Sequence, residues 1–159
     1  MKVEMKLQGV DGVLGVLQSL PAEVVSKRGG PVKLALAKGA RALRDKARQN
    51  LQRSIDIRGS DSTGTTVKSV IASRGKAPTG TKGERQLVRV KKKTFINAHG
   101  KRTSTLMTAN LLEYGSAHQP ATPWLRPSVA THGPMVIDII TADLIAQIDK
   151  TVKKLAKPA

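Results

Sequence analysis

Cysteine is absent from the 159-residue sequence. Disulfide staples and thiolate metal sites are therefore excluded, and the composition fits a reducing compartment such as the cytoplasm. Aromatic residues are also scarce, because Phe95, Tyr114 and Trp124 are the only three. The hydrophobic 39% of the chain must therefore build its core from leucine, valine, isoleucine and alanine.

Long apolar runs are lacking as well. No run approaches the roughly 18 residues of a membrane span, so we expect no membrane segment. Gln8, Asp11 and Gln18 interrupt the apolar residues near the amino terminus, and a signal peptide is not expected. The chain length predicts a single domain, residues 1–159.

Acidic residues are few: 11 Asp and Glu stand against 28 Lys and Arg, giving a net charge of +17. Such an excess predicts a polyanionic neighbour. Nucleic acid fits, because phosphate contacts release counterions and give affinity without sequence reading. Two alternatives are an acidic protein partner and a basic surface that is merely solvated.

Apolar residues at helical spacing predict three helices. The first spans residues 7–20. The second is the longest, with about 20 residues and a length of roughly 30 Å. Its apolar positions are Val32, Leu36, Ala40, Leu43, Ala47 and Leu51. The third is a C-terminal amphipathic helix over residues 137–155, which follows an interruption at His132-Gly133-Pro134.

The middle of the chain predicts strands. Residues 65–72 are rich in β-branched side chains. Residues 86–96 alternate imperfectly, 97–100 carry a turn signal, and 103–113 are expected to return as the second strand of a hairpin. The predicted fold is therefore α+β: helices at both ends, including one long helix, around a small antiparallel sheet of three or four strands.

Residues 82–102, the basic ribbon, hold eight cations and one acid, Glu84, so they supply +7 of the net charge. The ribbon is predicted to contact DNA or an acidic partner, and to stay mobile until that partner arrives, because its like charges repel and glycines flank it. Alternatively, its lysines protect an edge strand against aggregation. The cations are Lys82, Arg85, Arg89, Lys91, Lys92, Lys93, Lys101 and Arg102.

Catalysis finds little support in the sequence. His99, His118 and His132 are all expected to lie in loops, with no histidine pair at ligand spacing on one element. Glu113 and His118 can meet across a turn, but no nucleophile motif or paired carboxylate accompanies them. We expect no enzyme activity, no metal site and no cofactor.

Residues 111–127 read Leu-Leu-Glu-Tyr-Gly-Ser-Ala-His-Gln-Pro-Ala-Thr-Pro-Trp-Leu-Arg-Pro. They are expected to end a strand, turn, and begin a helix, with Pro127 in its first turn. Trp124 and Leu125 are the large apolar side chains of this connection, so we expect them to be buried in the protein core and to hold the loop in place.

The same stretch resembles the signature of the tail-completion (neck, head-tail joining) proteins of long-tailed lambdoid bacteriophages. The matching residues are Glu113, Tyr114, Gly115, Ser116, Pro123, Trp124, Leu125, Arg126 and Pro127. Ser62-Thr63-Gly64 and Ser69-Val70 match the family loosely, and in order and length the similarity covers residues 10–155. The chain departs from the family at Thr108-Ala109, where Tyr-Ala is often seen, and in its unusually basic middle.

The resemblance implies a structural virion protein of the phage neck, made in the host cytoplasm, that completes the tail and helps join it to the DNA-filled head. It further implies a homo-oligomeric ring, with six copies if it follows tail symmetry, around the DNA channel. The implied neighbours are the tail terminator or tail tube, the head connector or stopper proteins, and double-stranded DNA. The alternative is a free nucleic-acid-binding protein, without sequence specificity, that acts through the basic ribbon.

Overall fold

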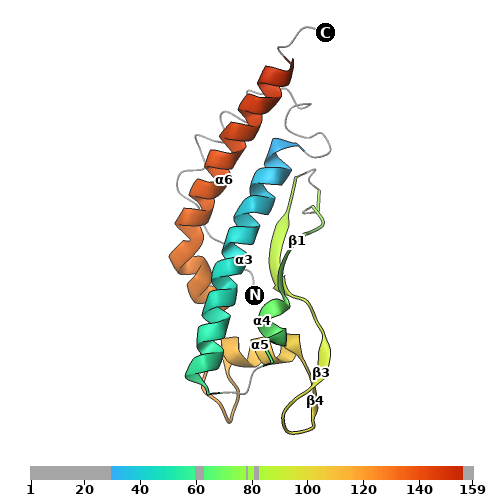
Figure 1. Ribbon diagram of the computed structural model, residues 1–159, viewed down its shortest axis with the longest axis vertical. Helices are drawn as coiled ribbons and strands as arrows, with labels where there is room; N and C mark the ends of the chain where they lie inside the picture. The colour runs from blue at the N-terminus through green and yellow to red at the C-terminus, as the bar shows by residue number, and fades with distance from the viewer. Residues whose placement is uncertain (1–29, 60–62, 78, 81–82, 156–159) are drawn as a thin grey trace.

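The computed structural model describes residues 30–59, 63–77, 79–80 and 83–155. Two long helices, α3 (Pro31–Ile57) and α6 (Leu125–Leu155), lie side by side, as Figure 1 shows. Two small antiparallel sheets and two short helices accompany α3. The predicted α+β class is confirmed. The helix predicted for residues 7–20 lies outside the described residues.

Helix α3 has 27 residues, against roughly 20 predicted. Proline is tolerated at its first position because the first N–H of a helix has no partner within it. Small residues on one face let α6 approach closely: a Cβ atom on Gly39 would overlap the Ile140 side chain of α6. Ala35 packs there with Leu144 and Ile148 of α6 in a small buried cluster.

Helix α6 runs for 31 residues through Pro134, so the predicted interruption at residues 132–134 is wrong. An internal proline removes one helical hydrogen bond. Pro134 is exposed while Gly133 before it is buried. The proline ring therefore points away from the body, and the packing of α6 along α3 outweighs the missing bond.

The segment Leu125–Thr151 of α6 is long and apolar enough to cross a membrane, judged by length and composition alone. Asp138 and Asp143 interrupt its apolar run, so the expectation of no membrane segment stays a prediction. Core helices of soluble proteins share these properties, but only 17% of the most apolar 18-residue stretch of α6 is buried. The rest of that stretch is half-buried against the body or exposed.

The opposite side of α3 covers the first sheet. Strand β1 (Val70–Arg74) pairs antiparallel with β2 (Gln86–Val90), with Val70 opposite Val90. Arg48 of α3 donates from Nε to the Val70 carbonyl at 3.0 Å, which fixes the sheet on the helix. The main buried cluster forms between these elements and contains Ala47, Leu51, Ile55, Val70, Ala109, Leu112 and Trp124.

The strand predicted for residues 65–72 begins later than expected. Helix α4 (Thr65–Lys68) occupies its first half, and β1 starts at Val70. Gly64 has a φ of 69°, which starts the helical turn, and the Ser69 hydroxyl donates to the Thr65 carbonyl at 2.7 Å. β-Branched residues favour strands mainly through packing, and here a single turn buries Thr66 instead.

The predicted hairpin over residues 86–113 is correct only at its turn. Strand β3 (Thr94–Ile96) pairs with β4 (Arg102–Ser104) across the turn at residues 97–100, where Asn97 Oδ1 accepts the N–H groups of His99 and Lys101. β2 pairs with β1 instead, so the described residues form two separate sheets rather than one. The expected return strand ends at Ser104, and residues 105–114 form helix α5 (Thr105–Tyr114).

Candidate partner interface and the clasp beneath it

The motif from Glu113 to Arg126 forms one bonded unit, which we call the clasp: Glu113, Trp124, Leu125 and Arg126. The buried Glu113 carboxylate, at the end of α5, accepts the main-chain N–H groups of Trp124 (2.8 Å), Leu125 (2.8 Å) and Arg126 (3.2 Å). The first N–H groups of a helix have no partner within it and attract negative charge. Glu113 therefore caps α6 from another helix.

Arg126 closes the clasp from outside. Its Nε donates to Glu113 Oε1 at 2.8 Å, and its Nη2 donates to the Glu113 carbonyl at 2.9 Å. The guanidinium also lies 5.3 Å from the centre of the Tyr114 ring. The end of α5 and the start of α6 are thus joined by both the main chain and the side chain of Glu113.

Burial raises the pKa of the Glu113 carboxyl, but the hydrogen bonds from Leu125, Trp124 and Arg126 outweigh it and leave the pKa below its usual range. A carboxyl whose pKa is lower in the folded state stabilises the fold above its unfolded pKa. That contribution is lost as the pH falls from the ordinary glutamate value, about 4.3, through the lower folded value. The clasp is therefore fully formed at neutral pH.

Trp124 anchors the clasp in the main core, as expected from the sequence. Its side chain is 3% exposed, and its Nε1 donates to the Ala109 carbonyl of α5 at 3.0 Å. Ser128 donates its hydroxyl to the Trp124 carbonyl at 2.5 Å and accepts Asn50 Nδ2 at 2.8 Å. One tryptophan thus holds α3, α5 and α6 together.

Gly115 allows the loop between α5 and α6 to turn back. Its φ is 76°, and a Cβ atom there would lie 2.8 Å from both Ala121 N and Gln119 O. The Thr122 N–H donates to the Leu112 carbonyl at 2.8 Å and closes the loop on α5. Ser116, Pro123 and Pro127 complete the motif on the exposed side, with Pro127 in the first turn of α6 as expected.

The basic ribbon lies next to the clasp, and its charge is presented to solvent. Lys82 lies outside the described residues. The other seven cations are all exposed, and none has an acidic partner within the described part of the chain: Arg85, Arg89, Lys91, Lys92, Lys93, Lys101 and Arg102. Glu84, the acid of the ribbon, pairs with Arg74 of β1 at 2.6 Å. The ribbon's positive field is therefore not neutralised from within these residues.

The buried Thr105 hydroxyl holds the loop that carries the three consecutive lysines. It accepts the Lys93 N–H at 2.9 Å and donates to the Lys91 carbonyl at 2.7 Å. The backbone of the loop is thus bonded to the start of α5 while the three side chains remain exposed. This role of Thr105 was not predicted from the sequence. A signal for the start of α5 was present next to it, because Ser104 is the N-cap residue of that helix and its Oγ accepts the Met107 N–H at 3.3 Å.

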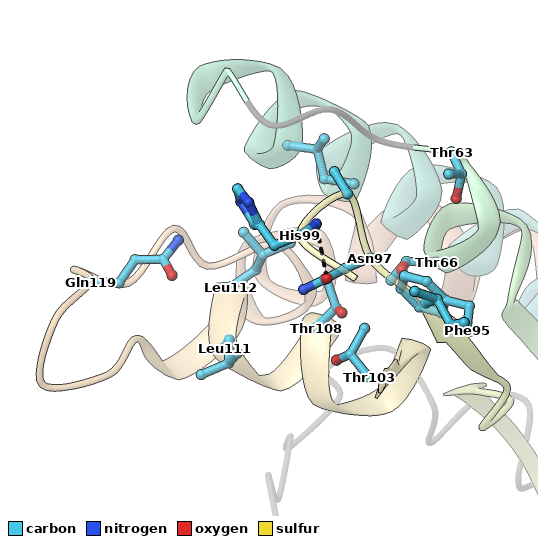
Figure 2. A pocket seen from close by; sticks show the side chains of 13 residues that line it. Thr63, Thr66, Phe95, Asn97, His99, Thr103, Thr108, Leu111, Leu112 and Gln119 are labelled. Atoms are coloured by element: carbon cyan, nitrogen blue, oxygen red, sulfur yellow. Dashed lines mark hydrogen bonds between the residues drawn. The ribbon is translucent and has the colours of Figure 1, made fainter. Parts of the chain in front are cut away.

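A cleft of about 730 Å³ opens between the tip of the β3–β4 hairpin, α5 and the end of α3, as Figure 2 shows. Phe95, Leu111 and Leu112 form much of its wall, with His99 and Gln119 among its polar groups. Among the residues that the structure describes, no carboxylate, lysine or cysteine lines it. His99 therefore has no acid–base partner in the cleft, and the described residues hold no group of three His, Asp or Glu suited to a metal.

The three histidines are not brought together: His99 and His118 are exposed in loops, and His132 lies within α6. The predicted mobility of the basic ribbon stays a prediction.

In comparisons with known proteins, no family model, no curated protein and no solved structure matches the chain. The family resemblance therefore continues to depend on the short motifs around the clasp.

Proposed function

We propose that the chain is a structural virion protein of the phage neck, which completes the tail end and helps join it to the DNA-filled head. The observation that carries this proposal is the clasp. The residues that resemble the tail-completion signature are used together, with Glu113, Trp124 and Arg126 fixing α5 on α6. A motif with one mechanical purpose fits an assembly protein, whose task is to hold its surfaces in fixed positions.

The cleft supports the same reading. The described residues of its wall offer hydroxyl, amide and apolar groups and the His99 imidazole, a set suited to binding a surface. The proposed neighbours are the tail terminator or tail tube on one side and the head connector or stopper on the other. The chain acts as a ring, with six copies if it follows tail symmetry, in the virion after assembly in the host cytoplasm.

The exposed basic ribbon suits a ring around the DNA channel. Seven exposed cations without acidic partners in the described chain create a strong local field. DNA in the channel, or an acidic face of a neighbouring protein, removes the repulsion among copies that this field would otherwise cause. The same exposed cations favour the second candidate, a free nucleic-acid-binding protein. Phe95 lines the cleft and is half-buried, so it offers no base-stacking platform in the ribbon.

The triple variant Lys91→Gln, Lys92→Gln, Lys93→Gln tests what the ribbon meets. We expect its fold and melting temperature to match those of the parent chain, because the three side chains are exposed and Thr105 bonds only their backbone. If DNA is the partner, the slope of log K against log salt falls by up to about three units, since each phosphate contact contributes roughly 0.9.

The readouts are DNA affinity at several salt concentrations and head-tail joining in infected-cell extracts. Lys68→Gln, Lys76→Gln, Lys153→Gln is the matched control, because these three lysines are also exposed and lie outside the ribbon. Unchanged DNA binding with failed joining identifies an acidic protein as the partner. Weakened DNA binding with normal joining favours the free nucleic-acid-binding protein over the neck. A variant that equals the parent in both assays contradicts a functional role for the three lysines.

A further inference from the structure

The outer face of α6 is apolar in the middle and acidic at both ends. Asp138, Ala142, Ile145 and Asp149, which we call the outer stripe, follow helical spacing and are all exposed. The Ile145 side chain is 54% exposed. Neither Asp138 nor Asp149 has a cationic partner among residues 30–155 as the structure describes them.

Ile145 is the large apolar side chain that α6 exposes, and the other large apolar side chains described in this helix are buried or half-buried. Helix α6 therefore offers a small contact surface with an apolar centre. Its size alone would allow a membrane. Two observations favour a protein instead. Asp138 and Asp149 lie on the same exposed stripe as Ile145, and ionised carboxylates at membrane depth are costly. Asp143, in the same segment, is held by Lys38 of α3 at 2.6 Å, which ties α6 to a helix of the chain's own body.

The end of the molecule formed by α5 offers a complementary surface. Leu106, Met107, Asn110 and Tyr114, which we call the ledge, are exposed along one face of α5. Met107 and Tyr114 are each 56% exposed. A groove of about 400 Å³ runs along the ledge and is bordered by Lys92, the central residue of the three consecutive lysines. The ledge is thus apolar with a cationic edge.

We propose that the ledge of one copy of the chain binds the outer stripe of α6 of a second copy. Ile145 enters the groove beside Met107 and Tyr114, and Asp149 pairs with Lys92. Asp149 lies one helical turn from Ile145, about 6 Å along the axis, so the apolar and charged contacts can form together. The ledge spans about 12 Å and the outer stripe about 16 Å, so the two match in length.

The two surfaces lie on different parts of the molecule, so the contact is heterologous: every copy offers one ledge and one outer stripe. Repeated contacts of this kind give a ring when the rotation closes. The inference rests on the proposed neck function for its ring, and it adds the surfaces that build that ring. The proposed contact also gives the loop of Lys91, Lys92 and Lys93 an acidic partner, because Lys92 faces Asp149 of the next copy.

Introduced cysteines test the contact directly, because the chain has none of its own. We expect the double variant Met107→Cys, Ile145→Cys to form a ladder of disulfide-linked multimers on mild oxidation of the concentrated, purified chain. A mixture of the two single variants is expected to give a 107–145 linked heterodimer. The control pair Met107→Cys, Ile57→Cys, in which Ile57 is 77% exposed on α3, is expected to give no ladder.

Charge reversal adds a second criterion. In the double-cysteine background, Lys92→Glu is expected to reduce the ladder about tenfold, and Asp149→Lys added to it is expected to restore it. Lys76→Glu, an exposed reversal away from the ledge, is the control and leaves the ladder unchanged. Absence of the ladder, an equal ladder from the control pair, or no effect of Lys92→Glu overturns the proposal.

The membrane alternative has its own readout. An environment-sensitive dye on Ile145→Cys is mixed with neutral phosphatidylcholine vesicles, which do not attract the basic ribbon. The proposal predicts no shift of the dye's emission, and a shift to the emission seen in an apolar environment overturns it.

The disulfide-linked ladder forms without a phage particle, so it can be separated from the neck function. If the ladder forms but the chain is absent from virions, the neck function is rejected and the contact between copies is retained. A neck protein without the ladder rejects the contact alone.

Discussion

Trp124→Ala is expected to lower the free energy of unfolding by about 3–5 kcal/mol, the usual cost of truncating a buried tryptophan to alanine. The side chain is 3% exposed and packs in the main cluster with Leu51, Ala109 and Leu112. The substitution opens a cavity where α3, α5 and the start of α6 meet. It also leaves the Ala109 carbonyl without the indole N–H. Urea unfolding followed by circular dichroism measures the loss.

Trp124→Phe is the matched control. It keeps most of the apolar volume but removes the hydrogen bond to Ala109, so we expect a much smaller loss, of about 1–2 kcal/mol. A Trp124→Ala chain as stable as the parent would mean that the tryptophan does not hold the core. Tryptophan emission near that of free indole in the parent chain would contradict its burial.

Glu113→Ala is expected to cost about 3 kcal/mol, although the residue is charged and charged residues are mostly exposed. The carboxylate accepts four hydrogen bonds, three of them from the first main-chain N–H groups around the start of α6. Its removal leaves these donors without an acceptor and leaves Arg126 with only its bond to the main-chain carbonyl of residue 113. Chemical unfolding at neutral pH measures the loss, and the start of α6 should lose protection from hydrogen exchange.

A pH series separates capping from general packing. In the parent chain the stabilisation by Glu113 is expected to fade as the pH drops below about 4.3, because the pKa of the carboxyl is lowered in the folded state. Glu113→Gln should lack this part of the pH dependence. Glu84→Gln is the control, since it breaks the Arg74 pair near the surface and should cost under about 1 kcal/mol. Equal losses for Glu113→Ala and Glu84→Gln would contradict the capping role.

Periodicity was a sound guide to the two long helices of this fold, but it missed the short helices α4 and α5 and placed the strands only in part. The spacing from Val32 to Leu51 predicted α3, and the apolar repeat after Ile137 predicted α6. Residues 103–113 were misread as a strand because apolar and polar residues alternate there over a short run. The N-cap at Ser104 starts a helix instead, and α5 is held by tertiary contacts of Ala109 and Leu112 with the core.

The candidate site was only partly predictable for a similar reason. The motif around Glu113 and the burial of Trp124 followed from residue type and order. The capping of α6 by Glu113 could not be predicted in this way. It depends on the turn at Gly115, which brings Trp124 back to Glu113 although the two residues are eleven positions apart. Thr105 was missed because its role comes from the lysines twelve and fourteen residues before it, a contact that local sequence does not encode.

The neck function is tested most directly by locating the chain in particles. The proposed function requires that a phage encodes the chain, so virions of that phage are imaged by electron cryomicroscopy, with the chain carrying a small carboxy-terminal label. The account predicts density for α3 and α6 in a ring at the head-tail junction, around the DNA channel, with the label in the same layer. A virion that lacks the chain, or that holds it in the capsid shell or along the tail tube, contradicts the account.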